Sequence, residues 1–284
     1  MFETIFLIVL GLIWIIAATI QDLRKKEVDN WLNFSLIIFA LGFRFFFSLF
    51  SETGFNFFYQ GLIGLGVFFV LGNIFYYSRV FAGGDAKLMI ALGTILPLSI
   101  DFHINLMYFF AFLLLFFIVG VIYGIVWSLF LMFKNIKLFK RKFKQLFNKK
   151  RNLIFLVMFF GLCLMLLGFY FSFLFFLGAL IFIFPYFFIY AKAIDEAAMI
   201  KRIKTKDLRE GDWIYSKVKI GRRYIQPNWE GLNMKQIKDI RKRYKKIKIR
   251  QGIVFVPVFL ISFIIFVYGI LFGIRILPFV FSGF

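Results

Sequence analysis

IFLIVLGLIWIIAATI, residues Ile5–Ile20, is an apolar run without a charged side chain, and QDLRKKEVDN (residues 21–30) follows it directly. About 20 apolar residues are needed to cross a bilayer as a helix. Positive charge precedes the apolar run in a cleavable signal, whereas here Arg24, Lys25 and Lys26 come after it. The stretch therefore predicts a retained membrane helix with its N-terminus outside.

The composition extends this interpretation to the whole chain of 284 residues. Hydrophobic residues make up 62% and charged residues 17%, whereas soluble domains are roughly 45–50% apolar and about 25% charged. Disorder is excluded as well, because it requires low hydrophobicity. We predict an all-α, polytopic helical membrane protein with about eight spans: Ile5–Ile20, Leu32–Phe50, Phe55–Ser78, Ala86–Ile100, Leu106–Phe133, Leu153–Phe169, Ser172–Tyr190 and Ile253–Ile274.

The net charge of +21 tests this topology. With the N-terminus outside and eight crossings, 33 of the 35 Lys and Arg residues fall on the inner side, as the positive-inside rule expects. The exceptions, Arg44 and Arg275, are expected to reach outward or to meet a carboxylate. A seven-span chain would place the basic residues 191–252 outside. The charge thus favours anionic lipid headgroups rather than nucleic acid as its partner.

The predicted spans and loops divide the chain into five segments. They are a membrane catalytic core (1–133), a basic cytoplasmic loop (134–152), a transmembrane hairpin (153–190), a basic cytoplasmic segment (191–252) and a C-terminal transmembrane helix (253–284).

The cytoplasmic segment 191–252 is short and poor in apolar residues for an independent domain. Asn233 and Gln236 have the spacing of a capping box. Apolar residues then recur at helical spacing from Met234 to Ile247, with Lys and Arg on the other faces. This pattern predicts an amphipathic helix on the inner membrane surface.

Two acids at the ends of predicted spans are the candidates for chemistry, because carboxylates at membrane depth are costly. Asp22 ends the first span, and Asp85 opens the fourth in the sequence FAGGDAKLM. Two crossings separate them, so both face the same side. Two carboxyl groups that share a proton are the machinery of aspartic proteolysis. The alternative roles are an interfacial acid paired with Arg24 or Lys26, and a plain helix N-cap.

The fourth predicted span, Ala86–Ile100, is shorter than a bilayer requires. Its start is therefore expected to be recessed, with Asp85 at the N-cap. Gly83 and Gly84 would let irregular backbone enter that recess and a substrate backbone approach closely. The glycines of the third span, Gly61, Gly64, Gly66 and Gly72, are expected to allow close helix packing.

These motifs resemble the type IV prepilin peptidase family, which includes the archaeal preflagellin peptidases and has a G-x-G-D signature. The resemblance lies in Asp22–Asn30 (DLRKKEVDN) and Ala82–Leu88 (AGGDAKL). GDW at Gly211–Trp213, GLNMKQI at Gly231–Ile237 and KIRQGIVFVPVFLISF at Lys248–Phe263 are similar to the C-terminal region of archaeal members. Ala82 replaces the first motif glycine, which would strain the loop if that position needed a positive φ.

The resemblance implies a membrane aspartic endopeptidase with Asp22 and Asp85 as catalytic residues and Gly83, Gly84 and Lys87 as supporting residues. It implies cleavage of a short basic leader from archaellin or pilin-like precursors at the cytoplasmic boundary of the cell membrane. No cofactor or metal is expected, and the single cysteine, Cys163, excludes the four-cysteine zinc site of bacterial N-methyltransferase relatives.

Two matters stay open at this stage. The basic leader would be received by local acids, namely Glu27, Asp29, Asp195 and Glu196, or the substrate would be recognised mainly through its apolar helix. The competing functions are an intramembrane aspartyl protease of other substrates and a non-enzymatic transporter or assembly protein.

Overall fold

A computed structural model describes residues 2–51, 54–221 and 223–272, so the prediction for Arg275 and the end of the last predicted span lie outside the described residues. The chain divides into two compact units, Met1–Gly124 with Val254–Phe284, and Ile125–Ile253. The C-terminal helix is thus part of the first unit, where it packs against the N-terminal helix. The predicted division into a core of residues 1–133 and a separate last helix differs from this arrangement.

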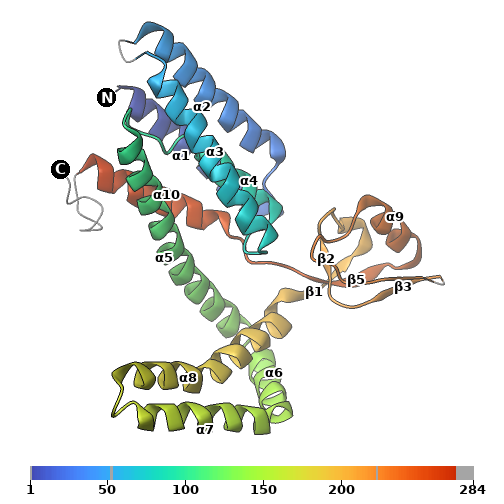
Figure 1. The fold of residues 1–284 in the computed structure, drawn as a ribbon. Coiled ribbons are helices and arrows are strands. Elements are labelled where there is room, and N and C mark those ends of the chain that lie inside the picture. The colour runs from blue at the N-terminus through green and yellow to red at the C-terminus, as the bar shows by residue number, and fades with distance from the viewer. Residues whose placement is uncertain (1, 52–53, 222, 273–284) are drawn as a thin grey trace. The chain divides into compact units, whose positions relative to one another are not determined.

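The first unit is a helical bundle around one apolar core (Figure 1). Its large buried side chains come from every part of the unit, for example Leu7, Phe68, Phe112 and Phe259. The helices are α1 (Phe2–Lys25), α2 (Asn30–Phe50), α3 (Asn56–Tyr77), α4 (Gly83–Leu92), most of α5 (Phe102–Lys134), and α10 (Val256–Leu271).

Small residues bring α3 and α4 into close contact. Close helix packing is what the glycines of the third predicted span led us to expect. A side chain at Gly64 would collide with the backbone oxygen of Gly93, and one at Gly93 would collide with that of Gly64. Such close approach is typical of helix packing in membranes. Gly66 differs from its neighbours, because the space beside it is open.

The fourth predicted span is wrong in extent: α4 ends at Leu92 after ten residues, and residues 93–100 follow as irregular backbone that is buried from Gly93 to Pro97. Irregular backbone at membrane depth needs protein partners for its polar groups, since the bilayer supplies none. Arg44 provides them. Its guanidinium donates to the carbonyl oxygens of Thr94 at 3.0 Å, of Phe57 at 2.9 Å and of Pro97.

Arg44 was expected to reach the interface or to meet a carboxylate, and this expectation is wrong. The side chain has no exposed surface and stacks on the Phe57 ring, 4.4 Å from its centroid. Thr94 and Pro97 lie in the unwound segment after α4, which leaves their carbonyl groups without helical partners, whereas Phe57 lies in the first turn of α3.

The helix count can be compared with the eight predicted spans. The described residues contain five helices long and apolar enough to cross a membrane, and a sixth if α6 (Ile136–Lys149) and α7 (Arg151–Leu167) form one bent span. α4 and α10 are shorter. The prediction of a helical polytopic membrane protein is confirmed, whereas the orientation with the N-terminus outside stays a prediction.

The second unit begins with helices. The predicted basic loop 134–152 is instead mostly helix α6, whose axis is turned by 76° from that of α7. α8 (Ser172–Ile194) packs against both and continues into the π-helical turn η1 (Asp195–Met199). Phe139 of α6 is buried with Ala193, Ile194 and Ala197, which explains why this basic stretch is ordered as a helix.

Residues 200–250 form a small α+β subdomain, so the description of the chain as all-α needs a correction. Strand β5 (Lys246–Arg250) pairs in antiparallel fashion with β1 (Ile200–Lys204) and β2 (Trp213–Ile214), and β3 (Val218–Ile220) pairs with β4 (Arg223–Ile225). A short 3₁₀ turn, η2 (Thr205–Asp207), follows β1.

The amphipathic helix predicted in this segment exists as α9 (Met234–Arg243), with the capping box of Asn233 and Gln236 in place. It is shorter than expected, because Ile247 belongs to β5. Its apolar side chains Ile237 and Ile240 are buried together with Ile247 and Ile249 of the sheet. The apolar face therefore packs on strands and not on a membrane surface.

Candidate active site

Asp22 lies in the last turn of α1 and is only 7% exposed. Its Oδ2 accepts the backbone N–H groups of Phe255 and Val256, both at 3.1 Å. Phe255 is the N-cap residue of α10 and Val256 is its first residue; Pro257 follows in the first turn. The first N–H groups of a helix have no partner within it and favour an anion. The Asp22 carboxylate is therefore held by the N-terminus of α10.

Asp85 lies in the first turn of α4 and is half-buried. The helix begins at Gly83 with Ala82 as its N-cap residue, so the expectation that Asp85 itself would be the N-cap is wrong by three residues. The carboxyl groups of Asp85 and Asp22 lie close enough to interact electrostatically. The fold thus brings together two acids that are 63 positions apart.

The glycine-rich turn before Asp85 is less strained than its sequence suggested. Ala82 has φ −71° and ψ 163°, an extended conformation that alanine adopts without penalty, so the loss of the first motif glycine does not strain this turn. Gly83 and Gly84 also lack positive φ values. A Cβ on Gly84 would meet the backbone nitrogen of Val28 at 3.5 Å, an ordinary van der Waals distance. The turn therefore does not need glycine for its own shape.

Lys87 links the two helices that adjoin the carboxyl pair. Its Nζ donates to Oδ1 of Asn30 at 2.7 Å, which ties α4 to the first residue of α2. The link between α1 and α2 is fixed further by Gln21, whose Oε1 accepts the N–H of Asp29 at 3.1 Å. Lys87 is therefore placed to hold the two acidic helix ends in register, and its ammonium group is engaged by Asn30.

Sequence inspection missed three residues of this site, namely Tyr123, Phe255 and Val256. Tyr123 of α5 interacts electrostatically with Asp22 and donates its hydroxyl proton to the carbonyl oxygen of Val254 at 2.8 Å. One signal was available: Pro257 marks a helix N-terminus, since proline is favoured in the first turn of a helix. That this terminus meets Asp22 follows only from the fold.

The described residues contain no group of three or more His, Cys, Asp and Glu side chains arranged to hold a metal ion. Chemically, the arrangement offers two neighbouring carboxyl groups, one of them fixed by two backbone donors, beside an open glycine turn. Such a pair can exchange protons with a water molecule and with a carbonyl group.

Comparisons with known proteins agree with this geometry. A family model described as the type IV leader peptidase family matches residues 9–129, a range that contains Asp22 and Asp85. The preflagellin peptidase of Methanococcus maripaludis is 26% identical over 135 residues, or 45% of this chain and 58% of that protein. That of Methanocaldococcus jannaschii is 32% identical over 89 residues, or 31% and 37%.

A third relative, the preflagellin peptidase of Methanococcus voltae, is 27% identical over 135 residues, which cover 45% of this chain and 57% of that protein. The chain thus spans less than two thirds of the length of each of these relatives. No solved structure matches the chain significantly.

Proposed function

Because the model of the type IV leader peptidase family matches residues 9–129, we propose that this protein is a membrane aspartic endopeptidase that removes the leader from archaellin or pilin-like precursors. Asp22 and Asp85 are the proposed catalytic pair. The observation that carries the proposal is that the fold brings Asp22 at the end of α1 near Asp85 at the start of α4, within the matched region. The start of α4 lies against the segment after α1, since Lys87 donates to Asn30 at 2.7 Å and a Cβ on Gly84 would lie 3.5 Å from the backbone nitrogen of Val28.

The proposed chemistry needs two proton transfers, and the carboxyl pair supplies both. One carboxylate accepts a proton from a water molecule, whose oxygen attacks the scissile carbonyl carbon, while the other carboxyl group donates a proton to the carbonyl oxygen. Collapse of the tetrahedral intermediate breaks the C–N bond, with a proton passing to the leaving nitrogen. The two N–H donors of α10 keep the Asp22 carboxylate in position throughout.

The substrate is recognised mainly through its apolar helix under this proposal. Three of the four acids considered for the basic leader are already paired: Asp29 with Lys25 at 3.0 Å, Asp195 with Arg250 at 2.9 Å and Glu196 with Lys142 at 3.0 Å. Each of these carboxylates would have to leave its own cation to receive a basic leader.

The proposed site faces the cytoplasm. Arg24, Lys25 and Lys26 begin two positions after Asp22 in the sequence, and Lys and Arg concentrate on the cytoplasmic side of membrane proteins. The same rule makes anionic lipids, rather than nucleic acid, the expected partners of the basic surface.

Coexpression with a series of archaellin and pilin precursors tests this function. Wild type, Asp22→Asn and Asp85→Asn are compared by gel shift and by N-terminal sequencing of the product, at matched membrane levels. The M. maripaludis relative serves as the positive control for each precursor. We expect cleavage at the leader junction by the wild type and its loss in both variants.

The alternative outcomes separate the competing functions. Cleavage that persists in either variant contradicts the catalytic pair. A product cut within the apolar helix indicates an intramembrane protease of other substrates. No cleavage of precursors that the control enzyme processes points to a non-enzymatic membrane protein.

A further inference from the structure

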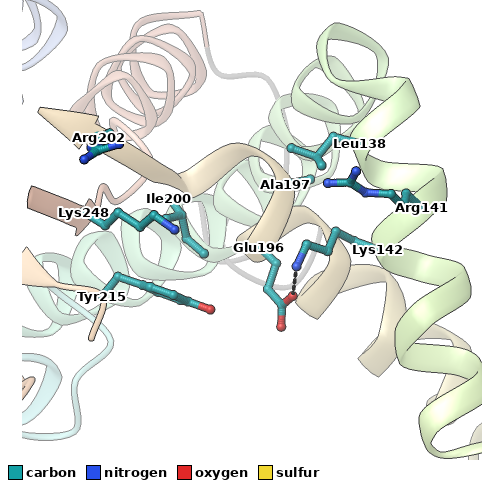
Figure 2. A pocket seen from close by; sticks show the side chains of 9 residues that line it. All are labelled: Leu138, Arg141, Lys142, Glu196, Ala197, Ile200, Arg202, Tyr215 and Lys248. Carbon is teal, nitrogen blue, oxygen red and sulfur yellow. Dashed lines mark hydrogen bonds and ion pairs between the residues drawn. The ribbon is translucent and has the colours of Figure 1, made fainter. Parts of the chain in front are cut away.

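A hollow of about 330 Å³ lies in the second unit, which contains neither Asp22 nor Asp85 (Figure 2). This volume falls within the roughly 300–1,000 Å³ of ligand sites. Side chains of α6, η1, β1 and β5, together with one residue after β2, line it: Leu138, Arg141, Lys142, Glu196, Ala197, Ile200, Arg202, Tyr215 and Lys248.

Cations from three separate elements converge on this hollow. Lys142 forms an ion pair with Glu196 at 3.0 Å, drawn as a dashed line in Figure 2. Arg141, Arg202 and Lys248 have no ion pair or side-chain hydrogen bond within the described part of the chain. The lining therefore carries three uncompensated positive charges.

The sheet register makes this concentration of charge unfavourable for the fold alone. Arg202 of β1 is directly opposite Lys248 of β5, and like charges in such a cross-strand pair are destabilising. The next pair on the same face, Lys204 opposite Lys246, repeats the pattern. The other face of the same strands is the apolar one that packs with α9. Nothing in the subdomain core requires cations at these positions.

We propose that this hollow binds a phosphate group, and that an anionic lipid headgroup supplies it. A phosphate accepts hydrogen bonds from Arg in bidentate geometry and from Lys as a point charge. Bound between Arg202 and Lys248, it replaces their repulsion with two attractive contacts, while Arg141 and the Tyr215 hydroxyl offer further donors.

Two features favour a lipid over a free ion. Trp213 is in register with Arg250 next to the cationic pairs, and Trp213 and Tyr215 are exposed aromatic residues of the kind enriched at membrane interfaces. In addition, α6 is turned by 76° from α7, so if α7 crosses the bilayer, α6 with Arg141 runs along its surface. The hollow then opens at headgroup level.

The test uses the full chain purified in mild detergent, with binding measured by isothermal titration. The probes are short-chain phosphatidylglycerol, short-chain phosphatidylcholine and inorganic phosphate, with an oligonucleotide as a competitor of the lipid, all without any precursor protein. The test variant is Arg202→Gln with Lys248→Gln. The control variant, Lys235→Gln with Lys238→Gln, removes the same charge from exposed positions of α9.

We expect phosphatidylglycerol to bind the wild type and the control, and to bind the test variant about 30-fold more weakly, since each cation near an anionic headgroup contributes roughly fivefold. Without lipid, the test variant should melt at the same temperature as the wild type or higher, because a like-charge pair is removed. If Arg202 and Lys248 served only the fold, the test variant would melt at a lower temperature than the wild type.

The remaining outcomes are decisive as well. Inorganic phosphate that binds as tightly as phosphatidylglycerol, and is lost in the same variant, supports a phosphate site but assigns it to the free ion. Equal losses in the test and control variants, equal binding of phosphatidylcholine, or displacement of the lipid by lower concentrations of an oligonucleotide overturn the proposal. The readout is independent of peptidase activity.

Discussion

Arg44 in the first unit and Arg202 in the second carry the same guanidinium group but are used in opposite ways. Arg44 has no exposed surface and donates to three backbone carbonyl groups. Arg202 is exposed and has Lys248 directly opposite. The neighbours of a charge, more than its residue type, therefore indicate whether it serves the fold or a ligand.

The acids of the two units also differ in the groups that surround them. Asp22 in the bundle is enclosed and held by two backbone N–H groups of the α10 N-terminus. The acids at the start of η1 in the second unit, Asp195 and Glu196, are paired with the cations Arg250 and Lys142. After these pairings the second unit still has unpaired cations, and their charge is available to an outside anion.

The largest effect is expected from Arg44→Met, which keeps the bulk of the side chain and removes its donors. The buried carbonyl groups of Thr94 and Pro97 lose their donor, at about 1–3 kcal/mol each, and the contact with Phe57 of α3 is lost as well, so we expect a loss of stability of about 3 kcal/mol or more. The loss of stability is measured by thermal melting in detergent, with the height of the monomer peak in size-exclusion chromatography as the readout. Arg44→Lys keeps the charge without the guanidinium fork, so its melting temperature should lie between those of Arg44→Met and the wild type. Melting of Arg44→Met at the wild-type temperature would contradict the assigned role.

The next prediction separates the catalytic and structural roles of Asp22. Asp22→Asn keeps an oxygen acceptor for the N–H groups of Phe255 and Val256, whereas Asp22→Ala leaves both donors unsatisfied. Both variants should lose cleavage, but only the alanine variant should also be less stable, by about 2 kcal/mol or more. The measurements are the precursor gel shift and the melting temperature. Equal stability of the two variants would show that the contact with α10 is not important for the fold.

The sequence predicted those parts of the fold that depend on local pattern. Apolar runs located α1, α2, α3 and α5 to within a few residues, and the positions of Asp22 and Asp85 at helix ends followed from span boundaries. The capping box at Asn233 was also correct, because it is a contact between residues three apart.

Features that depend on long-range contacts could not be predicted. The carbonyl groups of the unwound segment after Leu92 are satisfied by Arg44, about 50 positions earlier, and the contact of Asp22 with Val256 joins distant parts of the chain. Likewise, the sequence KKIKIR (residues 245–250) shows alternation typical of a strand, but the preceding helical periodicity masked it. Which cations then oppose one another is set by the register alone.

A smaller effect is expected at Gly84, where the first unit leaves space beside its carboxyl pair. Gly84→Ala should leave the melting temperature unchanged or slightly raised, since a Cβ fits beside Val28 and alanine is the better helix former. If the turn receives the substrate backbone, precursor cleavage should fall about tenfold, or roughly 1.4 kcal/mol in transition-state stabilisation. Gly66→Ala, which faces open space on α3, is the matched control. Equal cleavage by both variants would argue against backbone approach at this turn.

The smallest effect is expected from a substitution that replaces a pair of opposed cations, available to a ligand, with an ion pair that serves the fold. Lys248→Glu turns the opposed cations of β1 and β5 into a cross-strand ion pair, worth about 0.2–1 kcal/mol, so the second unit should become slightly more stable. The same change removes one positive charge from the hollow and adds a negative one, so phosphatidylglycerol binding should be lost while precursor cleavage in detergent stays unchanged. Melting curves at low and high salt identify the gain as electrostatic, because salt screens an exposed pair. A gain in stability with lipid binding retained would show that the opposed cations are not the phosphate site.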